Sequence, residues 1–389
     1  MKNINKYFRI VVLLVLLLVP VLHGYSQSNL QTGADQITLL LSKLKNKKVA
    51  LMVNQTSVIG KTHLVDSLKS LGVDIKKIFG PEHGFRGQAD AGEIITDAVD
   101  KKTLIPVVSL YGKSKKPTAK QLEDVDIVVF DIQDVGARFY TYIGSLHYLM
   151  EACAENKKKV MVLDRPNPNG SYVDGPVLRM ELKSFVGMHP VPITHGMSIG
   201  EYAQMINGER WLDKGIQCEL EIIKMKSWEH SDSYSLKIKP SPNLPNDQSI
   251  ALYPSTCFFE GTVLSIGRGT YHPFEWVGHP ELKKYSFQFT PIPIDGMDKD
   301  PKLKSQICFG LDLSKTKVKP EINLSYLIEM YNAFPDKSKF FNNYFNTLAG
   351  TPDLKNQIIK GMTASEIRAT WQKDLNAFKQ VRKKYLLYP

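Results

Sequence analysis

Residues 80–87, with the sequence GPEHGFRG, form the most informative stretch of the chain, because three side chains that could do chemistry lie close together in it. Three glycines and a proline give this stretch an irregular backbone, from which Glu82, His83 and Arg86 project. A carboxyl group held at a strand end under aromatic cover can have a raised pKa, which suits a general acid. We therefore predict that Glu82 is a catalytic acid and that His83 and Arg86 contact substrate. A simple Glu82–Arg86 ion pair is the alternative.

A second group of polar residues occupies positions 131–140, DIQDVGARFY. Asp131 and Asp134 are spaced to hold a metal, activate water or bind sugar hydroxyls. The metal is the weakest of these readings, because magnesium and calcium sites normally need more oxygen ligands than two carboxylates supply. Asp134 could instead cap the helix that follows. Arg138 and Tyr140 are candidates for substrate binding.

Two more stretches combine acids with arginines. In residues 164–170, DRPNPNG, two Xaa-Pro steps stiffen the loop that presents Asp164 and Arg165, as carboxylate or carbohydrate recognition requires. A purely structural turn is the alternative for residues 167–170. Later, Glu260 is followed by Arg268 between two glycines, which suits anion binding, and by Glu275.

Several common motifs are absent from the sequence. No G-x-G-x-x-G or G-x-x-x-x-G-K-[ST] loop follows the first predicted strand, which argues against a nucleotide-dependent enzyme. No G-x-S-x-G motif is present, which argues against an α/β-hydrolase. The four cysteines Cys153, Cys218, Cys257 and Cys308 contain no C-x-x-C pair, and Cys153 reads as a small buried hydrophobe. We predict neither a cofactor nor a metal.

The elements that position these side chains are predicted from short Val/Ile/Leu runs that alternate with helical segments. Strands are predicted at 48–53, 74–79, 105–110, 126–130 and 159–163, and helices at 63–71 and 142–156. Continuous apolar runs of this kind are typical of parallel strands buried on both faces. The fold class is therefore α/β, with a Rossmann-like doubly wound sheet. Ligands of such sheets bind beyond the carboxyl ends of the strands, where Asn54 and the residues above all fall.

The amino-acid composition changes near residue 245. Residues 239–247 are rich in proline and asparagine, which indicates a linker. Beyond it we predict a strand at 287–294 and helices at 322–334 and 364–384, the last opened by a capping box from Thr363 to Glu366. The predicted domains are therefore a catalytic domain over 27–244 and a smaller α+β domain over 245–389.

The first 26 residues have the order of a secretory signal peptide. Lys2, Lys6 and Arg9 precede an apolar run at 10–22 and the small residues Gly24 and Ser26. Cleavage would lower the net charge from +11 to about +8. We predict an exported, most simply periplasmic, protein without a stable membrane anchor, for which nucleic acid is a poor partner; an uncleaved anchor is the alternative. The composition, 43% hydrophobic and 23% charged, excludes a disordered chain.

Six ordered motifs together resemble the exo-β-N-acetylmuramidases of glycoside hydrolase family 171, the NamZ type. They are GPEHGFRG at 80, DIQDVGARFYTY at 131, DRPNP at 164, FEGT at 259, GRGT at 267 and PFE at 273. The resemblance spans essentially the whole mature chain. It implies a Rossmann-like domain and a smaller C-terminal domain with the active site in the cleft between them. It also implies removal of N-acetylmuramic acid from the non-reducing ends of peptidoglycan fragments, and Glu82 matches the family's proposed catalytic glutamate. Tyr271 and His272, before Pro273, depart from the family pattern at a position where we expect the residue type to vary among members.

Glycoside hydrolysis needs an acid and usually a second carboxylate. With Glu82 as the acid, the candidates for the second role are Asp131, Asp134, Asp164 and Glu260. The 2-acetamido group of the substrate could replace the protein nucleophile. The lactyl carboxylate of muramic acid calls for a bidentate cation. Its candidates are Arg86, Arg138, Arg165 and Arg268.

Two other classes of protein remain open at this stage. One is a periplasmic muropeptide- or sugar-binding protein without turnover. The other is a sugar deacetylase or phosphatase that uses Asp131 and Asp134 with a metal.

Overall fold

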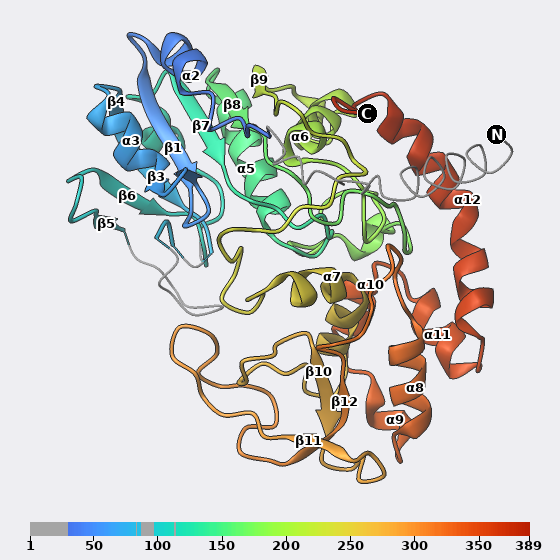
Figure 1. Ribbon diagram of the computed structural model, residues 1–389. Coiled ribbons are helices and arrows are strands. Elements are labelled where there is room, and N and C mark those ends of the chain that lie inside the picture. Colours follow the sequence, from blue (N-terminus) through green and yellow to red (C-terminus); the bar gives the residue numbers. More distant parts are fainter. Residues whose placement is uncertain (1–29, 83, 87–96, 113) are drawn as a thin grey trace, which may run out of the picture. The chain divides into compact units, whose positions relative to one another are not determined.

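The computed structural model describes residues 30–82, 84–86, 97–112 and 114–389 (Figure 1). Residues 31–389 form one compact unit, and the description below concerns that unit. The predicted signal peptide and His83 lie outside the described residues.

A central sheet supports the first half of this unit. Among the described residues its strand order is β5-β6-β4-β1-β7-β8-β9. The parallel strands are β1 (Lys48–Val53), β4 (Asp74–Gly80), β6 (Pro106–Ser109), β7 (Ile127–Asp131), β8 (Lys159–Leu163) and β9 (Leu220–Ile223). The short β5 (Ala98–Val99) pairs antiparallel with β6 at one edge. Counted along the chain, the parallel strands lie in the order 3-2-1-4-5-6, which is the doubly wound Rossmann order. The predicted fold class is confirmed.

Burial on both faces explains the apolar runs of these strands. In β1 every residue after Lys48 is buried. Because side chains alternate along a strand, Ala50 and Met52 enter one hydrophobic core, whereas Val49 and Leu51 enter the other. A strand buried on both faces has no room for polar residues except at its ends.

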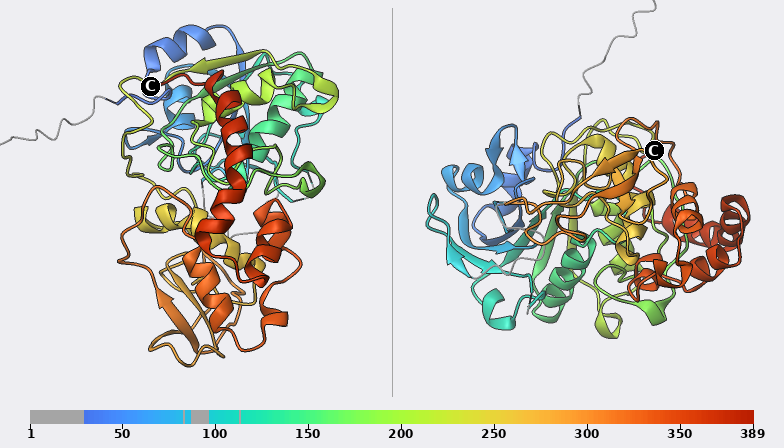
Figure 2. Two further views of the ribbon diagram at one scale, coloured as in Figure 1. Left: turned by 90° about the vertical axis from the view of Figure 1, so that its right-hand side faces the viewer. Right: turned by 90° about the horizontal axis from the view of Figure 1, so that it is seen from below.

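Helices cover both faces of the sheet. Helices α2 (Ile37–Leu44) and α3 (Leu64–Ser70) contribute to the core on one face. Helices α4 (Ala119–Leu122), α5 (Tyr142–Glu155) and α6 (Ile199–Gly208) contribute to the core on the other (Figure 2). The smaller elements of this half are β2 (Val58–Ile59), β3 (Thr62–His63), η1 (Met180–Leu182) and η2 (Asp213–Gly215).

The second half combines helices with a small antiparallel sheet. Its strands β10 (Trp276–His279), β12 (Cys308–Asp312) and β11 (Phe287–Phe289) lie in that order. Its helices are α7 (Asp247–Thr256), η3 (Cys257–Gly261), α8 (Ser325–Ala333), α9 (Lys337–Phe340), α10 (Phe345–Ala349), α11 (Asp353–Ile359) and α12 (Ala364–Lys383). The strand predicted over 287–294 ends at Phe289, since Pro291 and Pro293 cannot donate to a sheet. The capping box at Thr363 is present.

The two halves share one hydrophobic core, and α12 links them. The core on the α5 and α6 face continues into the second half through residues such as Phe258, Phe345 and Phe378. Beyond α12 the chain returns to the sheet, where the Tyr388 hydroxyl donates to Asp164 and Leu387 N–H donates to Glu201 (Figure 1).

All four cysteines are buried and carry free thiols, and Cys153 has no exposed surface, as predicted. Within the described ranges, none of the helices combines the length and apolar character needed to span a bilayer.

Candidate active site

A cavity that is open to solvent lies beyond the carboxyl ends of the strands and is lined by both halves of the chain. From the first half come Glu82, after β4, and residues 139–142, which join β7 to α5. The second half contributes Glu260, Arg268 and Phe274 among others. The complete lining is Glu82, Phe139, Tyr140, Thr141, Tyr142, Val186, Ser241, Asn243, Leu244, Tyr253, Glu260, Arg268 and Phe274.

Glu82 reaches this cavity with both carboxylate oxygens held by hydroxyl groups. Tyr111 donates to Oε1 at 2.8 Å, and Thr141 donates to Oε2 at 3.0 Å. Tyr111 lies there because the chain after β6 runs beside the end of β4, where Leu110 N–H bonds to the Gly80 carbonyl. The carboxyl group is therefore fixed in direction without a cation bound to it among the described residues.

Glu260 and Arg268 form an ion pair in the same cavity. Nε and Nη2 of Arg268 both lie 2.7 Å from Oε1 of Glu260, and the guanidinium stands 5.2 Å from the centre of the Phe274 ring. About a quarter of each side chain is accessible. Although burial favours the neutral form, the charge of Glu260 raises the pKa of Arg268, which stays cationic.

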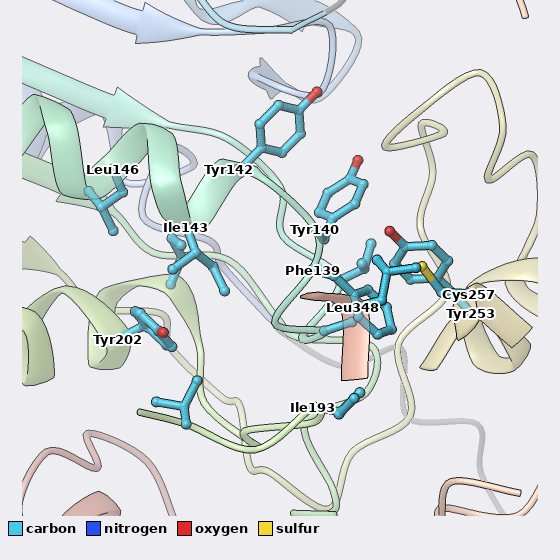
Figure 3. Close-up of a cluster of buried hydrophobic side chains, with 14 of the residues drawn as sticks. Phe139, Tyr140, Tyr142, Ile143, Leu146, Ile193, Tyr202, Tyr253, Cys257 and Leu348 are labelled. Carbon is cyan, nitrogen blue, oxygen red and sulfur yellow. The ribbon is translucent and has the colours of Figure 1, made fainter. Parts of the chain in front are cut away.

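Aromatic rings build one wall of the cavity. Figure 3 shows the side chains of Phe139, Tyr140, Tyr142 and Tyr253. The Tyr140 ring meets those of Tyr142 and Tyr253 edge to face, with centroids 5.0 and 6.1 Å apart, and Phe139 meets Tyr253 at 5.1 Å. The Tyr140 hydroxyl donates to the Pro240 carbonyl at 2.8 Å, which ties this wall to the segment between the halves. Such a wall can bind the apolar face of a sugar ring.

One buried polar atom in the cavity lining lacks a partner. Oδ1 of Asn243 has no hydrogen-bond partner within the described part of the chain. The Tyr142 hydroxyl, also in the lining, interacts with the Asn54 side chain at the end of β1. Because buried polar groups are nearly always bonded in native proteins, the Asn243 oxygen can accept a hydrogen bond from a polar ligand.

Asp131 and Arg165, by contrast, bind each other. Arg165 donates from Nε to Oδ1 at 2.5 Å and from Nη2 to Oδ2 at 2.8 Å, and both side chains are almost fully buried. Arg165 also lines a second cavity, of about 520 Å³, together with Thr56, Gln133 and Tyr234. The structure therefore places Arg165 outside the lining of the Glu82 cavity.

Asp134 is buried beside His195. Its Oδ2 accepts the Gly136 N–H at 2.6 Å, whereas Oδ1 has no partner among the described residues. Burial raises the pKa of Asp134 to about 7, and burial lowers the pKa of His195 to about 3. Nε2 of His195 lies 3.9 Å from Oδ2, so near neutral pH this contact is formed without a full ion pair.

Asp164 and Glu275 hold the backbone and neighbouring side chains in place. Asp164 accepts from Ser198 Oγ, the Tyr388 hydroxyl and the backbone of Arg165 and Gly200. Burial raises its pKa to about 6 in spite of these donors. Glu275, 2% exposed, bonds to Asn246 and His272 instead.

Two of the candidate arginines also bind protein groups outside the cavity lining. Arg86 does not pair with Glu82; it makes a bidentate pair with Asp100 at 2.9 and 3.0 Å and also contacts Asp66. Arg138, 2% exposed, donates to four backbone carbonyls. These carbonyls belong to Pro176, Val191, Leu348 and Ala349.

The Asp131 and Asp134 pair does not converge on a common point for a metal. The first binds Arg165 and the second binds a backbone N–H. Across the described ranges, moreover, no three His, Cys, Asp or Glu residues are grouped so as to hold a metal ion.

Sequence reasoning missed Tyr111, Thr141, Asn243 and Tyr344. Tyr111 and Thr141 bond to Glu82, and Asn243 lines the cavity. Tyr344 precedes α10, and burial raises its pKa to about 12, with the charges of Glu260 and Glu82 adding to the rise. Thr141 belongs to the motif at 131–142, and Tyr111 directly follows the strand predicted at 105–110, so the sequence signalled both positions. Asn243 lies in the predicted linker, and no motif marks Tyr344.

Comparison with known proteins connects this chain to one family. The model of the N-terminal region of exo-β-N-acetylmuramidase NamZ matches residues 49–248, and that of the C-terminal region matches residues 251–388. The chain belongs to the NamZ family of exo-β-N-acetylmuramidases. It is a glycosidase. The resemblance inferred from the six motifs is thereby confirmed.

Relatives of this NamZ-family chain match it over nearly its whole length. The peptidoglycan β-N-acetylmuramidase NamZ of Bacillus subtilis (strain 168) is 39% identical over 383 residues, covering 92% of this chain and 91% of the relative. Two solved DUF1343 family proteins of Bacteroides fragilis NCTC 9343 superpose with TM-scores of 0.87 and 0.81 at 45% and 29% identity. Each covers 93% of this chain, and the match covers 99% and 100% of theirs.

Proposed function

We propose that the protein is an exported exo-acting glycosidase that releases N-acetylmuramic acid from the non-reducing ends of peptidoglycan fragments, with Glu82 as the general acid. The observation that carries this proposal is that Glu82 lines the same cavity as the Glu260–Arg268 pair. The family and the Bacillus subtilis relative support the sugar. The signal-like order of residues 1–26 supports export.

In this proposal Glu82 protonates the leaving oxygen of the glycosidic bond. Its carboxyl group lies between Tyr111 and Thr141, whose hydroxyls fix its direction toward the cavity. A proton donor held at a set angle contributes more to the rate than a mobile one, because the bound geometry already resembles the transition state.

We assign the second carboxylate role to Glu260. Of the four candidates, Asp131, Asp134, Asp164 and Glu260, the last lines the cavity with Glu82, whereas the others bind protein groups away from that lining. Glu260 can stabilise positive charge on the sugar or act on water. The 2-acetamido group of the substrate is the competing nucleophile. The stereochemical outcome can be measured by NMR, because the anomer released in the first turnovers distinguishes retention from inversion.

We assign the lactyl carboxylate of the substrate to Arg268. The guanidinium of this residue uses Nε and one Nη on Glu260, which leaves N–H donors for a second carboxylate. Arg86, Arg138 and Arg165 lie outside the cavity lining. The terminal nitrogens of Arg138 bond to backbone carbonyls, and Arg86 and Arg165 pair with Asp100 and Asp131.

The assignment of the acid is tested with Glu82→Gln. The mature protein should release muramic acid from a chromogenic β-muramide, without added metal or nucleotide, and the variant should lose at least about 100-fold in kcat. Glutamine keeps the size of the side chain and can still bond to Tyr111, so the folded protein should persist. Full activity in this variant would rule out Glu82 as the acid.

The assignment of the lactyl contact is tested with Arg268→Met. Loss of a charge-assisted hydrogen bond should lower kcat/KM on the muramide about 10- to 100-fold. It should lower kcat/KM much less on the matching N-acetylglucosaminide, which lacks the lactyl group. Arg179→Met is the control, since Arg179 pairs with Asp353 on the surface. Equal losses on both sugars would place Arg268 in general site structure instead.

A further inference from the structure

Asn243 brings an unused acceptor to the lining of the cavity. The residue is 1% exposed, and its Oδ1 has no hydrogen-bond partner among the described residues. The carboxylates of the same lining differ, because Glu82 accepts from two hydroxyls and Glu260 binds Arg268. A buried acceptor without a donor costs stability. Its presence in a cavity lining therefore indicates that a ligand supplies the donor.

The nitrogen of this amide fixes which way the oxygen points. Nδ2 of Asn243 donates to the Met297 carbonyl at 3.0 Å. A rotated amide would place Oδ1 against that carbonyl, and two acceptors would then face each other. The backbone N–H of Asn243 donates to Ser241 Oγ at 3.3 Å, and Pro242 and Pro245 stiffen the segment on either side. Asn243 therefore offers the cavity an acceptor, not a donor, in a fixed position.

A loop of the second half connects Asn243 to the arginine assigned to the lactyl carboxylate. Met297, which accepts from Asn243, belongs to this loop. Earlier in the same loop, the Ile292 N–H donates to the carbonyl of Gly269, the residue after Arg268, at 2.8 Å. Both Asn243 and Arg268 line the cavity. The same loop therefore holds the unused acceptor and the residue next to the cation.

We propose that Oδ1 of Asn243 accepts the N–H of the 2-acetamido group of muramic acid and so selects 2-acetamido sugars. The inference rests on the proposed function. The acetamido and lactyl groups of muramic acid stand on adjacent ring carbons, so a sugar bound through Arg268 presents its amide near that arginine. A sugar hydroxyl can donate or accept, whereas the amide N–H can only donate and needs an acceptor when it is buried. Leu244, which also lines the cavity, offers apolar surface to the acetyl methyl group.

The test compares two ligands that differ only in this donor. One is N-acetylmuramic acid; the other is its 2-acetoxy analogue, in which an ester oxygen replaces the N–H and the size is nearly the same. In calorimetric titration of the wild type, the Kd of the analogue should be at least about tenfold higher, because Asn243 then faces an oxygen instead of a donor. Asn243→Leu removes the acceptor, so the two Kd values should then agree within about twofold.

Asn346→Leu is the matched control. Oδ1 of Asn346 is also buried without a partner in the described part of the chain, but this residue belongs to α10 and lies outside the cavity lining. The control should keep the preference of the wild type. Equal Kd values in the wild type, or a preference that survives Asn243→Leu, would overturn the proposal. Selective binding by a wild type that hydrolyses no β-muramide would support the Asn243 contact and overturn the proposed function.

Discussion

At the scale of single residues, the candidate carboxylates differ in what their oxygens already bind. Asp131 is saturated by Arg165, and Asp164 by four donors. Glu82 is bound by hydroxyls, and it shares a solvent-open cavity with Glu260. A sequence shows that all four acids follow apolar segments, but the donors that occupy them come from distant positions. This is why the acids could be proposed from the sequence and not ranked.

The same reasoning applies to the arginines. Arg138 and Arg165 stand in motifs as prominent as that of Arg268, but their partners are backbone carbonyls and a buried carboxylate. Asn243 shows the opposite case, since no motif marks it and only the folded chain brings it to the cavity that Glu82 lines. The sequence shows which side chains can bind an anion. Which group each of them binds depends on the neighbours that folding brings to it.

Asp134 allows a prediction about pH and stability. Its pKa of about 7 in the folded protein lies above the roughly 3.9 of an unfolded chain. Between about pH 4 and 7 the native state therefore holds a proton that the unfolded state has lost, so this group's contribution to stability falls as pH rises. Asparagine at this position cannot ionise and can still accept the Gly136 N–H.

Through this group, the unfolding free energy of the wild type should fall between pH 5 and pH 8. In Asp134→Asn we expect that fall to be smaller by about 2 kcal/mol. Urea denaturation of both proteins at the two pH values measures the difference. His195 titrates in the opposite sense, because its pKa is lowered, but it is present in both proteins and cancels in the comparison. An identical pH dependence in wild type and variant would contradict the raised pKa.

At the scale of elements, the accuracy of the strand predictions follows from burial. The bounds of β1 and β8 agree with those predicted, because both are continuous apolar runs with polar residues directly after them. Strand β9 was missed: its residues LEII include the half-buried Glu221, which bonds to Lys159 and Lys43 at the sheet edge. An edge strand is apolar over a shorter stretch and so leaves a weaker signal.

The segment after α12 allows a prediction about tertiary contacts. The Tyr388 hydroxyl donates to Asp164 at 2.6 Å and accepts the Met225 N–H at 2.9 Å, all of them buried. Tyr388→Phe should therefore lower the unfolding free energy by about 1–3 kcal/mol. The loss should be larger at pH 8 than at pH 5, because Asp164, with a pKa near 6, is charged at the higher pH and then needs the donor more.

Tyr385→Phe provides the matched control for this prediction. The Tyr385 hydroxyl bonds to Glu209 near the surface, so its removal should change the unfolding free energy by no more than about 0.5 kcal/mol. Thermal denaturation of the two variants beside the wild type measures both effects. Equal destabilisation by the two substitutions would show that the segment is not anchored through Asp164.

At the scale of the whole molecule, the predicted boundary at residues 244 and 245 crosses a region of continuous packing. One hydrophobic core joins Met52 and Phe130 of the sheet to Phe258, Phe345 and Phe378 of the second half. The family models meet near the same point, between residues 248 and 251. A change in local amino-acid composition need not mark the edge of a hydrophobic core. Composition depends on neighbours along the chain, whereas packing depends on residues that are neighbours only after folding.

Arg138 ties the two halves together at this junction. Its Nη2 donates to the carbonyls of Leu348 and Ala349, while Nη1 donates to Pro176 and Val191. Gly350 stands directly beside it with φ of +74°, and a Cβ there would lie 2.4 Å from Nη2. The close approach of backbone and guanidinium therefore requires glycine.

We expect the two halves to unfold in one cooperative transition, because each would expose the shared core if the other melted first. Circular dichroism in the far and near ultraviolet should give coincident urea curves. Arg138→Met should lower the midpoint, since four buried carbonyls lose their donor, at a cost of about 3 kcal/mol or more. Two separated transitions in the wild type would show that the halves fold independently. Separate transitions in Arg138→Met with a single one in the wild type would identify this arginine as the coupling between them.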